Sequence, residues 1–436
     1  MRYALIAGEQ ALASYAYEEA LAHFQRGLTA REGQAVDVQV AALLFGLGRA
    51  QAATLQLHQM HEVYISLNRA FDCYLELGAI DDALAVAEYP VTNPPGRSGA
   101  TRLIAHALAL IPPESHQAGR LLARYGRVLG VEEVDYDGAQ EAFQRALTIA
   151  RYEQDIPLEM WALTWGASVD AYHLRWPESL KKELQAAELA RRIDEPLAEV
   201  WARHWAVHAY HVLGDLQGAI QQAQAGLTVA ERLRDCQWLA SMLWANEIVS
   251  SLQGQWEAAR QYNNRGLALA PKDPRHLSTR ALLEYQVGNV AAGAAYLEQL
   301  LGIIGLEPVS PTLEQGFSAL ALPATARITG TLEQLDTAEQ VARQLLASTP
   351  AVPLVIHMTR IGLALVAVLR GDASLAAEQH TILGLTPGSS LLATIICTDR
   401  LLGLISQVLG EYDQAISHLE AAMAFCGRAG YRPEYA

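Results

Sequence analysis

The sequence predicts an all-α protein, a superhelical solenoid of about ten stacked helix pairs. The main observation is a repeat of small residues, Ala139, Ser179, Ala219 and Ala259, whose spacings (179−139, 219−179 and 259−219) are each 40. A fixed period in this range is typical of stacked repeats, in which each unit is buried against its neighbours. In addition, no segment alternates with period two for long enough to predict a sheet.

Composition agrees with such a stack. The chain has 436 residues, of which 51% are hydrophobic and 18% charged, whereas soluble domains carry roughly 25% charged residues. The net charge is −15, and the 32 Lys and Arg residues are scattered along the chain. Because a nucleic-acid-binding surface needs clustered basic residues, we expect no direct binding of nucleic acid.

The first part of the chain, 1–111, contains irregular repeats. The small residues Ala20 and Ala83 occupy equivalent positions but lie 63 apart (83−20). Helical patterns over roughly 35–55 and 58–77 fill the interval between them. We therefore expect helix pairs here that depart from the common period.

The second part, 112–305, has the regular 40-residue repeats. The first helix of a pair is expected to end at a glycine, which can adopt a left-handed conformation without steric cost. A large residue two positions later is expected to plug the turn, and a small residue five positions after the glycine lets two helices approach closely. The glycines of this pattern, which continues beyond 305, are Gly214, Gly254, Gly288, Gly371 and Gly410.

The third part, 306–436, continues the repeats with spacings of 34, 45, 38 and 39, counted from Ala259 through Gly293, Ala338, Ala376 and Ala415. Proline and glycine predict breaks in the helices at 90–99, 306–311 and 386–390. The final helix contains Leu419, Met423 and Phe425 and has no evident capping partner. Because solenoid ends need a polar outer face, we expect self-association through this end.

A row of histidine and tryptophan residues is the candidate ligand site. Spacings of four and three place His204, His208 and His211 on one face of one helix. The repeat aligns Trp244 with His204, and Trp161 with Trp201. Such side chains in a concave groove can hold a peptide or a small ligand. The alternative is that they only fill the space between adjacent helices.

No pattern for catalysis, a metal or a cofactor emerges. The chain lacks the phosphate-binding loop G-x-x-x-x-G-K-[ST] and the G-x-S-x-G nucleophile elbow, so we expect no catalytic residues and no cofactor. The histidine row lacks an acidic ligand in register on its helix, so we expect no metal. The four cysteines form no C-x-x-C pair and are expected to be free thiols. With no signal peptide and no long apolar run, we expect a cytoplasmic protein without a membrane partner.

The repeated glycine, large residue and small residue at fixed offsets resemble the tetratricopeptide repeat. Over nearly the whole chain, the sequence is similar to the tetratricopeptide region of bacterial STAND-type ATPase signalling regulators. The matching stretches include AGEQALASYAYEEALAHFQRGL, RITGTLEQLDTAEQVARQLL and the closing TDRLLGLISQVLGEYDQAISHLEAAMAFCGRAGYRPEYA. Relatives of this kind are MalT-like activators of the LuxR family and ATPase-linked adenylate or guanylate cyclases. The resemblance implies a sensor or scaffold part, without the switch module.

Three functions remain open at this stage. The first is a non-catalytic module that binds a protein, a peptide or a small-molecule inducer in its groove, as part of a bacterial signal-transduction regulator. The second is a stand-alone adaptor that acts in trans. An enzyme built on a helical solenoid is the third, and it has no nucleophile and base in the sequence to support it.

Overall fold

The computed structural model describes residues 2–436 except 32, 34, 36, 56–58, 92–98, 304–312, 331, 333, 348–350, 384–385, 393 and 395. Within these residues the secondary structure is helical, with one isolated antiparallel bridge between Ser390 and Cys397. The prediction of an all-α protein is confirmed. The predicted break at 306–311, and most of that at 90–99, lie outside the described residues.

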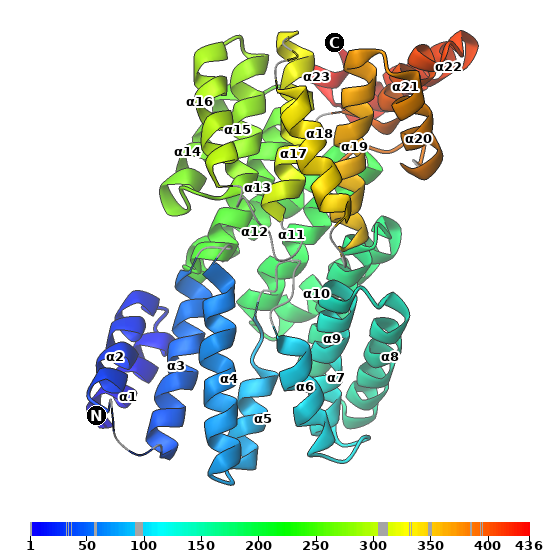
Figure 1. Ribbon diagram of the computed structural model, residues 1–436. Helices are drawn as coiled ribbons and strands as arrows, with labels where there is room; N and C mark the ends of the chain where they lie inside the picture. The colour runs from blue at the N-terminus through cyan, green and yellow to red at the C-terminus, as the bar shows by residue number, and fades with distance from the viewer. Residues whose placement is uncertain are drawn as a thin grey trace. The chain divides into compact units, whose positions relative to one another are not determined.

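Helices follow one another along the described parts of the chain (Figure 1). The earlier ones are α1 (Arg2–Ala13), α2 (Tyr17–Thr29), α3 (Val38–Thr54), α4 (Met60–Glu76), α5 (Ile80–Glu88), α6 (Ala100–Ala109), α7 (His116–Val128), the π-helical turn η2 (Leu129–Glu133), α8 (Tyr136–Glu153), α9 (Ile156–Tyr172), α10 (Trp176–Arg192), α11 (Pro196–Leu213) and α12 (Leu216–Leu233). The later ones are α13 (Cys236–Leu252), α14 (Trp256–Leu269), α15 (Pro274–Gln286), α16 (Val290–Gly302), α17 (Leu313–Thr329), α18 (Leu335–Ala347), α19 (Pro353–Arg370), α20 (Ala373–Leu383), α21 (Thr398–Leu409), α22 (Tyr412–Ala429) and α23 (Arg432–Tyr435).

The chain divides into two compact units. Unit 1 comprises Met1–Val169, Gln185–Glu199 and Val229–Leu239, and unit 2 comprises Asp170–Leu184, Val200–Thr228 and Ala240–Ala436. The residues of α9 to α13 are therefore divided between the two units, helix by helix. The sequence-based division at 111 and 305 follows repeat regularity and stays a prediction.

Unit 1 contains closely packed helix pairs. Phe24 of α2 is fully buried, with its ring beside Gly8 of α1 and Gly46 of α3. A Cβ atom at either glycine would lie 2.5 Å or less from this ring, so only glycine admits the phenylalanine there. A second core, over α3 to α7, includes the buried side chains of Tyr64 and Phe71.

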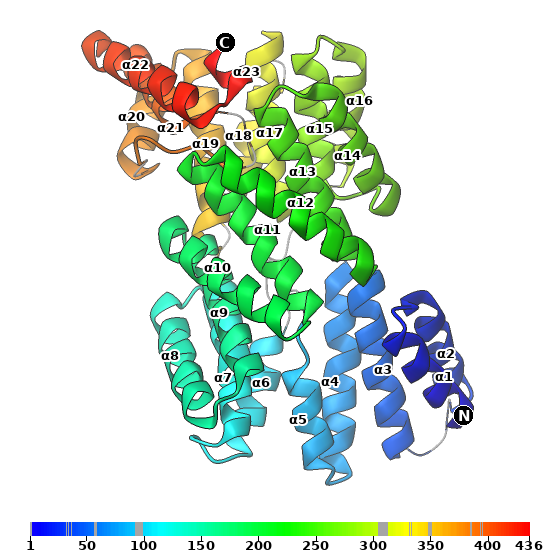
Figure 2. The same cartoon turned by 180° about the vertical axis from the view of Figure 1, so that it is seen from behind.

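Unit 2 shows the repeat most clearly. Each first helix of a pair packs against the next first helix, in the series α15, α17, α19 and α21, while the second helices α16, α18 and α20 pack beside them. The short α23 packs on α22 (Figure 2). At the crossing of α17 and α19, a Cβ atom at Gly362 would lie 2.2 Å from the carbonyl oxygen of Ala319. This alternate stacking is a tetratricopeptide-like arrangement of helix pairs.

The repeat signature is confirmed in the turns. Gly214, Gly254, Gly288, Gly371 and Gly410 all adopt positive φ, between 65° and 81°. The anchors Ala139, Ser179, Ala219 and Ala259 are fully buried. The residue two positions after each of these glycines begins the second helix, and it is large except for Ala373. Val290 and Tyr412 are 56% and 67% exposed and do not plug their turns; for these two residues that expectation was wrong.

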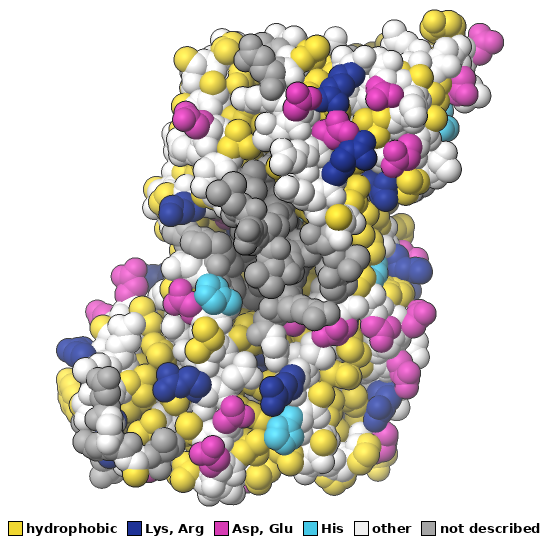
Figure 3. All heavy atoms as spheres, in the orientation of Figure 1, with side chains coloured by type: hydrophobic (Ala, Val, Ile, Leu, Met, Phe, Trp, Pro, Cys, Tyr) yellow, Lys and Arg dark blue, Asp and Glu magenta, His cyan; other side chains and the backbone are white. Residues whose placement is uncertain are grey.

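Two surface properties bear on partners. Among the described helices, α19 is long and apolar enough to cross a membrane, yet 61% of it is buried inside the protein. A core helix has the same length and composition, and α19 packs against α17, α18, α20 and α21. On the face seen in Figure 3, Lys and Arg side chains are interspersed with Asp and Glu.

Candidate functional site

The predicted histidine row forms a packed aromatic cluster in unit 2. His204 and His208 of α11 are 4.6 Å apart between ring centroids, and His208 is 4.8 Å from Trp244 of α13. Trp244 in turn contacts Phe317 of α17, with a centroid separation of 5.7 Å. The structure therefore brings together three of the six residues that the sequence proposed, although all three are buried, with exposures of 6%, 1% and 4%.

The other three are buried or partly buried. His211 is fully buried at the end of α11, beside Ser390 and Tyr431. Trp201 is also buried, at 1% exposure. Trp161 belongs to unit 1, where it stacks on Trp165 at 4.8 Å.

Burial fixes the charge state of the histidines. It lowers the pKa of His204 to about 3, with a further contribution from the nearby Arg275, and it lowers the pKa of His211 to about 4. The pKa of His208 lies well below its ordinary value, again mainly because of burial. All three imidazoles are therefore neutral at pH 7 and offer no cationic charge to a ligand.

Several polar atoms in the cluster are buried without a hydrogen-bond partner among the described residues, one of them the indole nitrogen of Trp244. Neither ring nitrogen of His208 has a hydrogen-bond partner among the described residues, although both are buried. A buried polar group without a partner costs free energy. The ligand-binding role predicted for Trp161, Trp201, His204, His208, His211 and Trp244 stays a prediction, because the structure shows their packing and no ligand.

The described part of the chain does not bring together side chains suited to binding a metal ion. No group of three or more His, Cys, Asp and Glu side chains there could hold a metal ion. None of the four cysteines forms a disulfide, as expected, and Cys397 and Cys426 are buried. The thiols of this pair interact, which lowers the pKa of Cys397 and raises that of Cys426.

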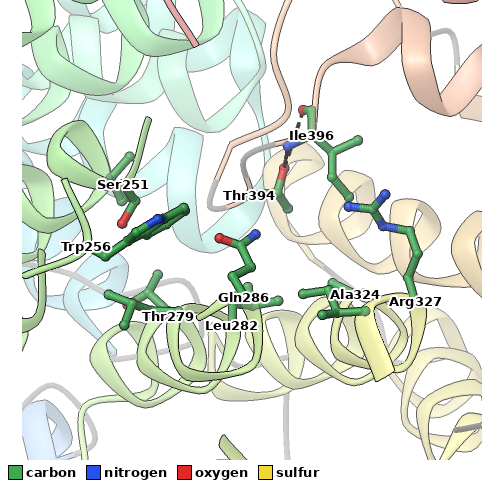
Figure 4. Close-up of a pocket in the computed structure, with 12 residues that line it drawn as sticks. Ser251, Trp256, Thr279, Leu282, Gln286, Ala324, Arg327, Thr394 and Ile396 are labelled. Carbon is green, nitrogen blue, oxygen red and sulfur yellow. Dashed lines mark hydrogen bonds between the residues drawn. The ribbon is translucent and has the colours of Figure 1, made fainter. Parts of the chain in front are cut away.

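A slot with apolar walls opens elsewhere in unit 2 (Figure 4). The space in it that the centre of a water molecule can occupy is about 40 Å³, and the slot is partly open to solvent. The apolar walls are formed by Ile248, Trp256, Leu282, Leu283, Ala324, Ile328 and Ile396. Ligand pockets typically have mostly apolar walls and a few polar groups. The polar groups here come from Ser251, Thr279, Gln286, Arg327 and Thr394.

The slot is continuous with a wider, polar cleft. The two share Trp256, Gln286, Arg327 and Ile328. The cleft adds the basic residues Arg400 and Arg432 and the acidic residue Glu434. An apolar recess therefore meets a basic opening across the Arg327 side chain.

Arg327 is the charged group at this boundary. Its Nε atom is buried and has no hydrogen-bond partner among the residues that the structure describes. Burial, together with repulsion from Arg400, lowers the pKa of Arg327 below its usual value, although Glu434 offsets part of the effect. A guanidinium remains charged in proteins, so the site holds a half-buried cation without an ion pair to a described acid.

Glu434 is already engaged by other groups. Its Oε2 accepts a hydrogen bond of 2.6 Å from Arg400, and its Oε1 accepts one of 3.0 Å from the backbone N–H of Cys397. Both carboxylate oxygens therefore have partners, and neither is within ion-pair distance of Arg327.

Sequence reasoning did not find this site. Arg327, Arg400 and Arg432 are separated by 73 and 32 residues (400−327 and 432−400), so no local spacing relates them. The large residue expected two positions after Gly254 is Trp256, but that expectation concerned only the turn.

Comparisons with known proteins find similarity in structure alone. No family model and no curated protein sequence matches the chain. A Rap protein complexed with competence and sporulation factor has a TM-score of 0.48 and 13% identity, over 79% of this chain and 96% of that one. A tetratricopeptide-repeat protein from Parabacteroides merdae has a TM-score of 0.43 and 14% identity, over 69% and 98%.

A signal transduction ATPase with a tetratricopeptide-repeat sensor, from Pyrococcus horikoshii, has a TM-score of 0.37 and 13% identity, over 84% of this chain and 52% of that one. The solved neighbours thus include tetratricopeptide-repeat proteins, and one of them is a STAND ATPase. Their similarity is too low to carry an argument about function, and the MalT-like family remains an expectation.

Proposed function

We propose that this chain is a non-catalytic binding module that takes a ligand in the slot and cleft of unit 2. One observation supports the proposal. The apolar slot lies next to Arg327, and no acidic side chain among the described residues forms an ion pair with this arginine. An anionic ligand at this point would supply the missing partner for Arg327, while its apolar part would fill the slot. Both contributions favour the bound state.

The wider role that we propose is that of a sensor or scaffold in a bacterial, cytoplasmic signal-transduction regulator. It rests on the sequence resemblance to STAND-type regulators. In such a role the ligand would bind a helical repeat array whose neighbouring helices pack on one another, as α15, α17 and α19 do. A stand-alone adaptor that acts in trans would use the same site.

Ligand screening by thermal shift tests the binding role. The full chain is screened against small molecules and short peptides, each with the wild type and with Trp256→Ala. Trp256 lines both the slot and the cleft, so we expect ligands that stabilise the wild type and lose their effect in the variant. Ligands that stabilise both proteins equally would place the binding site elsewhere.

The matched control for this screen is Trp238→Ala. Trp238 is buried, at 4% exposure, and belongs to unit 1. Its loss lowers the melting temperature of the protein, but the ligand-induced shift is expected to persist. The comparison separates a loss of binding from a general loss of stability.

A further inference from the structure

The Arg327 side chain is the charged group that lines the slot, and its effect on the choice of ligand rests on the binding role proposed above. In Figure 4 the guanidinium extends along one side of the slot toward the segment of Thr394 and Ile396, opposite the ring of Trp256. The amide of Gln286 lies between the two. A ligand in the slot would therefore meet the guanidinium at one side and apolar side chains elsewhere.

The charged side chains of the cleft favour a ligand that carries a single negative charge. Arg400 is paired with Glu434 at 2.6 Å, which leaves Arg327 and the exposed Arg432 as the basic groups. Arg327 is half-buried, whereas Arg432 is open to solvent, so only Arg327 can act on a ligand that is shielded from water. One buried guanidinium compensates one charge, and a dianion would also be repelled by Glu434.

The apolar walls of the slot determine which kind of ligand body can bind beside the charged group. Leu282 and Leu283 of α15, Ile328 of α17 and Ile396 offer no charged group. Thr394 is engaged internally, since its hydroxyl accepts a hydrogen bond of 3.1 Å from the N–H of Ile396. Besides the hydroxyl groups of Ser251 and Thr279, Gln286 offers an amide in the centre of the slot that could bind a second polar group of the ligand.

We propose that the slot binds a small monoanionic carboxylic acid with a compact apolar or aromatic body, its carboxylate on Arg327. A guanidinium can bind a carboxylate through two parallel hydrogen bonds. The body of the acid lies against Trp256 and the leucine and isoleucine walls. A neutral ligand of the same shape would leave Arg327 without a partner, and a phosphate monoester would bring a second charge into the slot.

Calorimetry with three matched probes tests this inference on the full chain. The probes are 3-phenylpropionate, its amide and 2-phenylethyl phosphate, which share a phenyl ring and differ in the end group. We expect the carboxylate to bind at least about tenfold more tightly than either of the others, since one charge-assisted pair is worth about a factor of ten. Arg327→Gln should abolish that preference, whereas Arg428→Gln, at an exposed position on α22, should retain it.

Each outcome decides a separate point. Equal binding of carboxylate and amide to the wild type, or a preference that survives Arg327→Gln, overturns the assignment of Arg327. Tighter binding of 2-phenylethyl phosphate than of 3-phenylpropionate would contradict the proposal that the ligand carries a single negative charge. If the amide binds and Trp256→Ala abolishes that binding, the slot is still a ligand site and only the charge assignment fails. Absence of binding by all three probes overturns the inference, while the thermal-shift screen judges the binding role independently.

Discussion

The phenolic hydroxyl of Tyr431 donates a hydrogen bond of 2.5 Å to the backbone carbonyl oxygen of His211, 220 residues earlier. His211 lies in the last turn of α11, where carbonyl groups lack partners within the helix. The N–H of Ser390 similarly donates to the carbonyl oxygen of Val212, at 2.9 Å. Within unit 2, two distant segments thus complete the end of one helix, and Tyr431 itself is 1% exposed.

Removal of this hydroxyl should destabilise unit 2. Tyr431→Phe retains the ring but removes the donor, so we expect the free energy of unfolding to fall by about 1 kcal/mol. Urea unfolding followed by tryptophan fluorescence measures the change. Tyr435→Phe, at a site that is 54% exposed, should alter stability by less than about 0.5 kcal/mol. Equal effects of the two substitutions would show that the bond to His211 contributes nothing.

The helix crossing at Gly362 predicts a contrast between two glycines. Gly362→Ala places a methyl group 2.2 Å from the carbonyl oxygen of Ala319, so α17 and α19 must separate, at a cost of about 1–3 kcal/mol. Gly316→Ala on α17 meets its nearest atom at 3.5 Å and should stabilise the helix by up to ~1 kcal/mol. Thermal unfolding of the two variants checks the opposite signs. A neutral Gly362→Ala would contradict the close crossing.

The buried histidines predict loss of stability in acid. The pKa of His211 is lowered to about 4 by burial, whereas in the unfolded chain it is near 6.5. Between pH 6.5 and 4 the unfolded chain therefore takes up a proton that the folded chain does not. The stability that this histidine contributes is fully present above pH 6.5 and is lost as the pH falls to about 4, by up to ~1.4 kcal/mol per pH unit.

Urea unfolding between pH 7 and 4.5 measures this slope. His211→Gln should make it shallower, because one of the titrating groups is gone. The exposed His380 of α20 provides the control, and His380→Gln should leave the slope as in the wild type. An unchanged slope in His211→Gln would contradict the burial of a neutral imidazole.

Asp235 in unit 1 predicts the opposite pH dependence. Burial raises its pKa to about 7, although the backbone N–H groups of Trp238 and Gln237 oppose the shift. The folded carboxyl thus stays protonated where the unfolded one, with a pKa near 3.8, is ionised. The stability it contributes is present below pH 3.8 and is lost as the pH rises to about 7.

Asp235→Asn should therefore stabilise the protein at pH 7.5 and have little effect at pH 4. Asparagine can still accept the hydrogen bond of 3.0 Å from the N–H of Trp238, since both residues are good N-caps. The gain at high pH has a ceiling of about 4 kcal/mol, from a shift of roughly three pKa units. A variant that is less stable than the wild type at pH 7.5 would contradict the raised pKa.

An exposed apolar stripe on α22 predicts self-association. Its members are separated by four, three and four residues and so share one face: Tyr412 (67% exposed), Ile416 (57%), Leu419 (36%) and Met423 (56%). Of the three residues predicted to be uncovered, Phe425 is instead buried against Tyr431. Contiguous exposed apolar surface favours association.

Analytical ultracentrifugation measures that association. We expect self-association at protein concentrations on the order of tens of micromolar, and its loss in Ile416→Glu combined with Met423→Glu. Ile382→Glu, on α20 with 48% exposure, introduces the same charge outside the stripe and should leave association intact. A wild type that stays monomeric throughout this range would refute the expectation.

The fold could be predicted from the sequence because the repeat pattern involves residues that lie close together in the chain. Gly214 and Ala219 mark a turn and a helix contact within one repeat, and the same offset recurs along the chain, so the arrangement of pairs follows from neighbours alone. The exposure of Val290 could not be read in this way, because it depends on what packs over the turn.

The candidate site was less predictable for a physical reason. His204 and His208 were correctly placed on one helix face together, but the sequence could not show that Trp244 and Phe317 would bury them. Arg327 and Glu434 come from segments 107 residues apart (434−327). Their juxtaposition depends on the path of the chain in space, which repeat spacing leaves undetermined.

The division of α9 to α13 between the two units has a practical consequence for truncation. Because each of these helices supplies residues to both units, no single cut in the chain yields one unit whole and leaves the other intact. A truncation that ends within 170–239 would remove part of each unit. Limited proteolysis in this interval should therefore release no stable fragment that corresponds to a unit. The chain must therefore be engineered by substitution rather than by dissection.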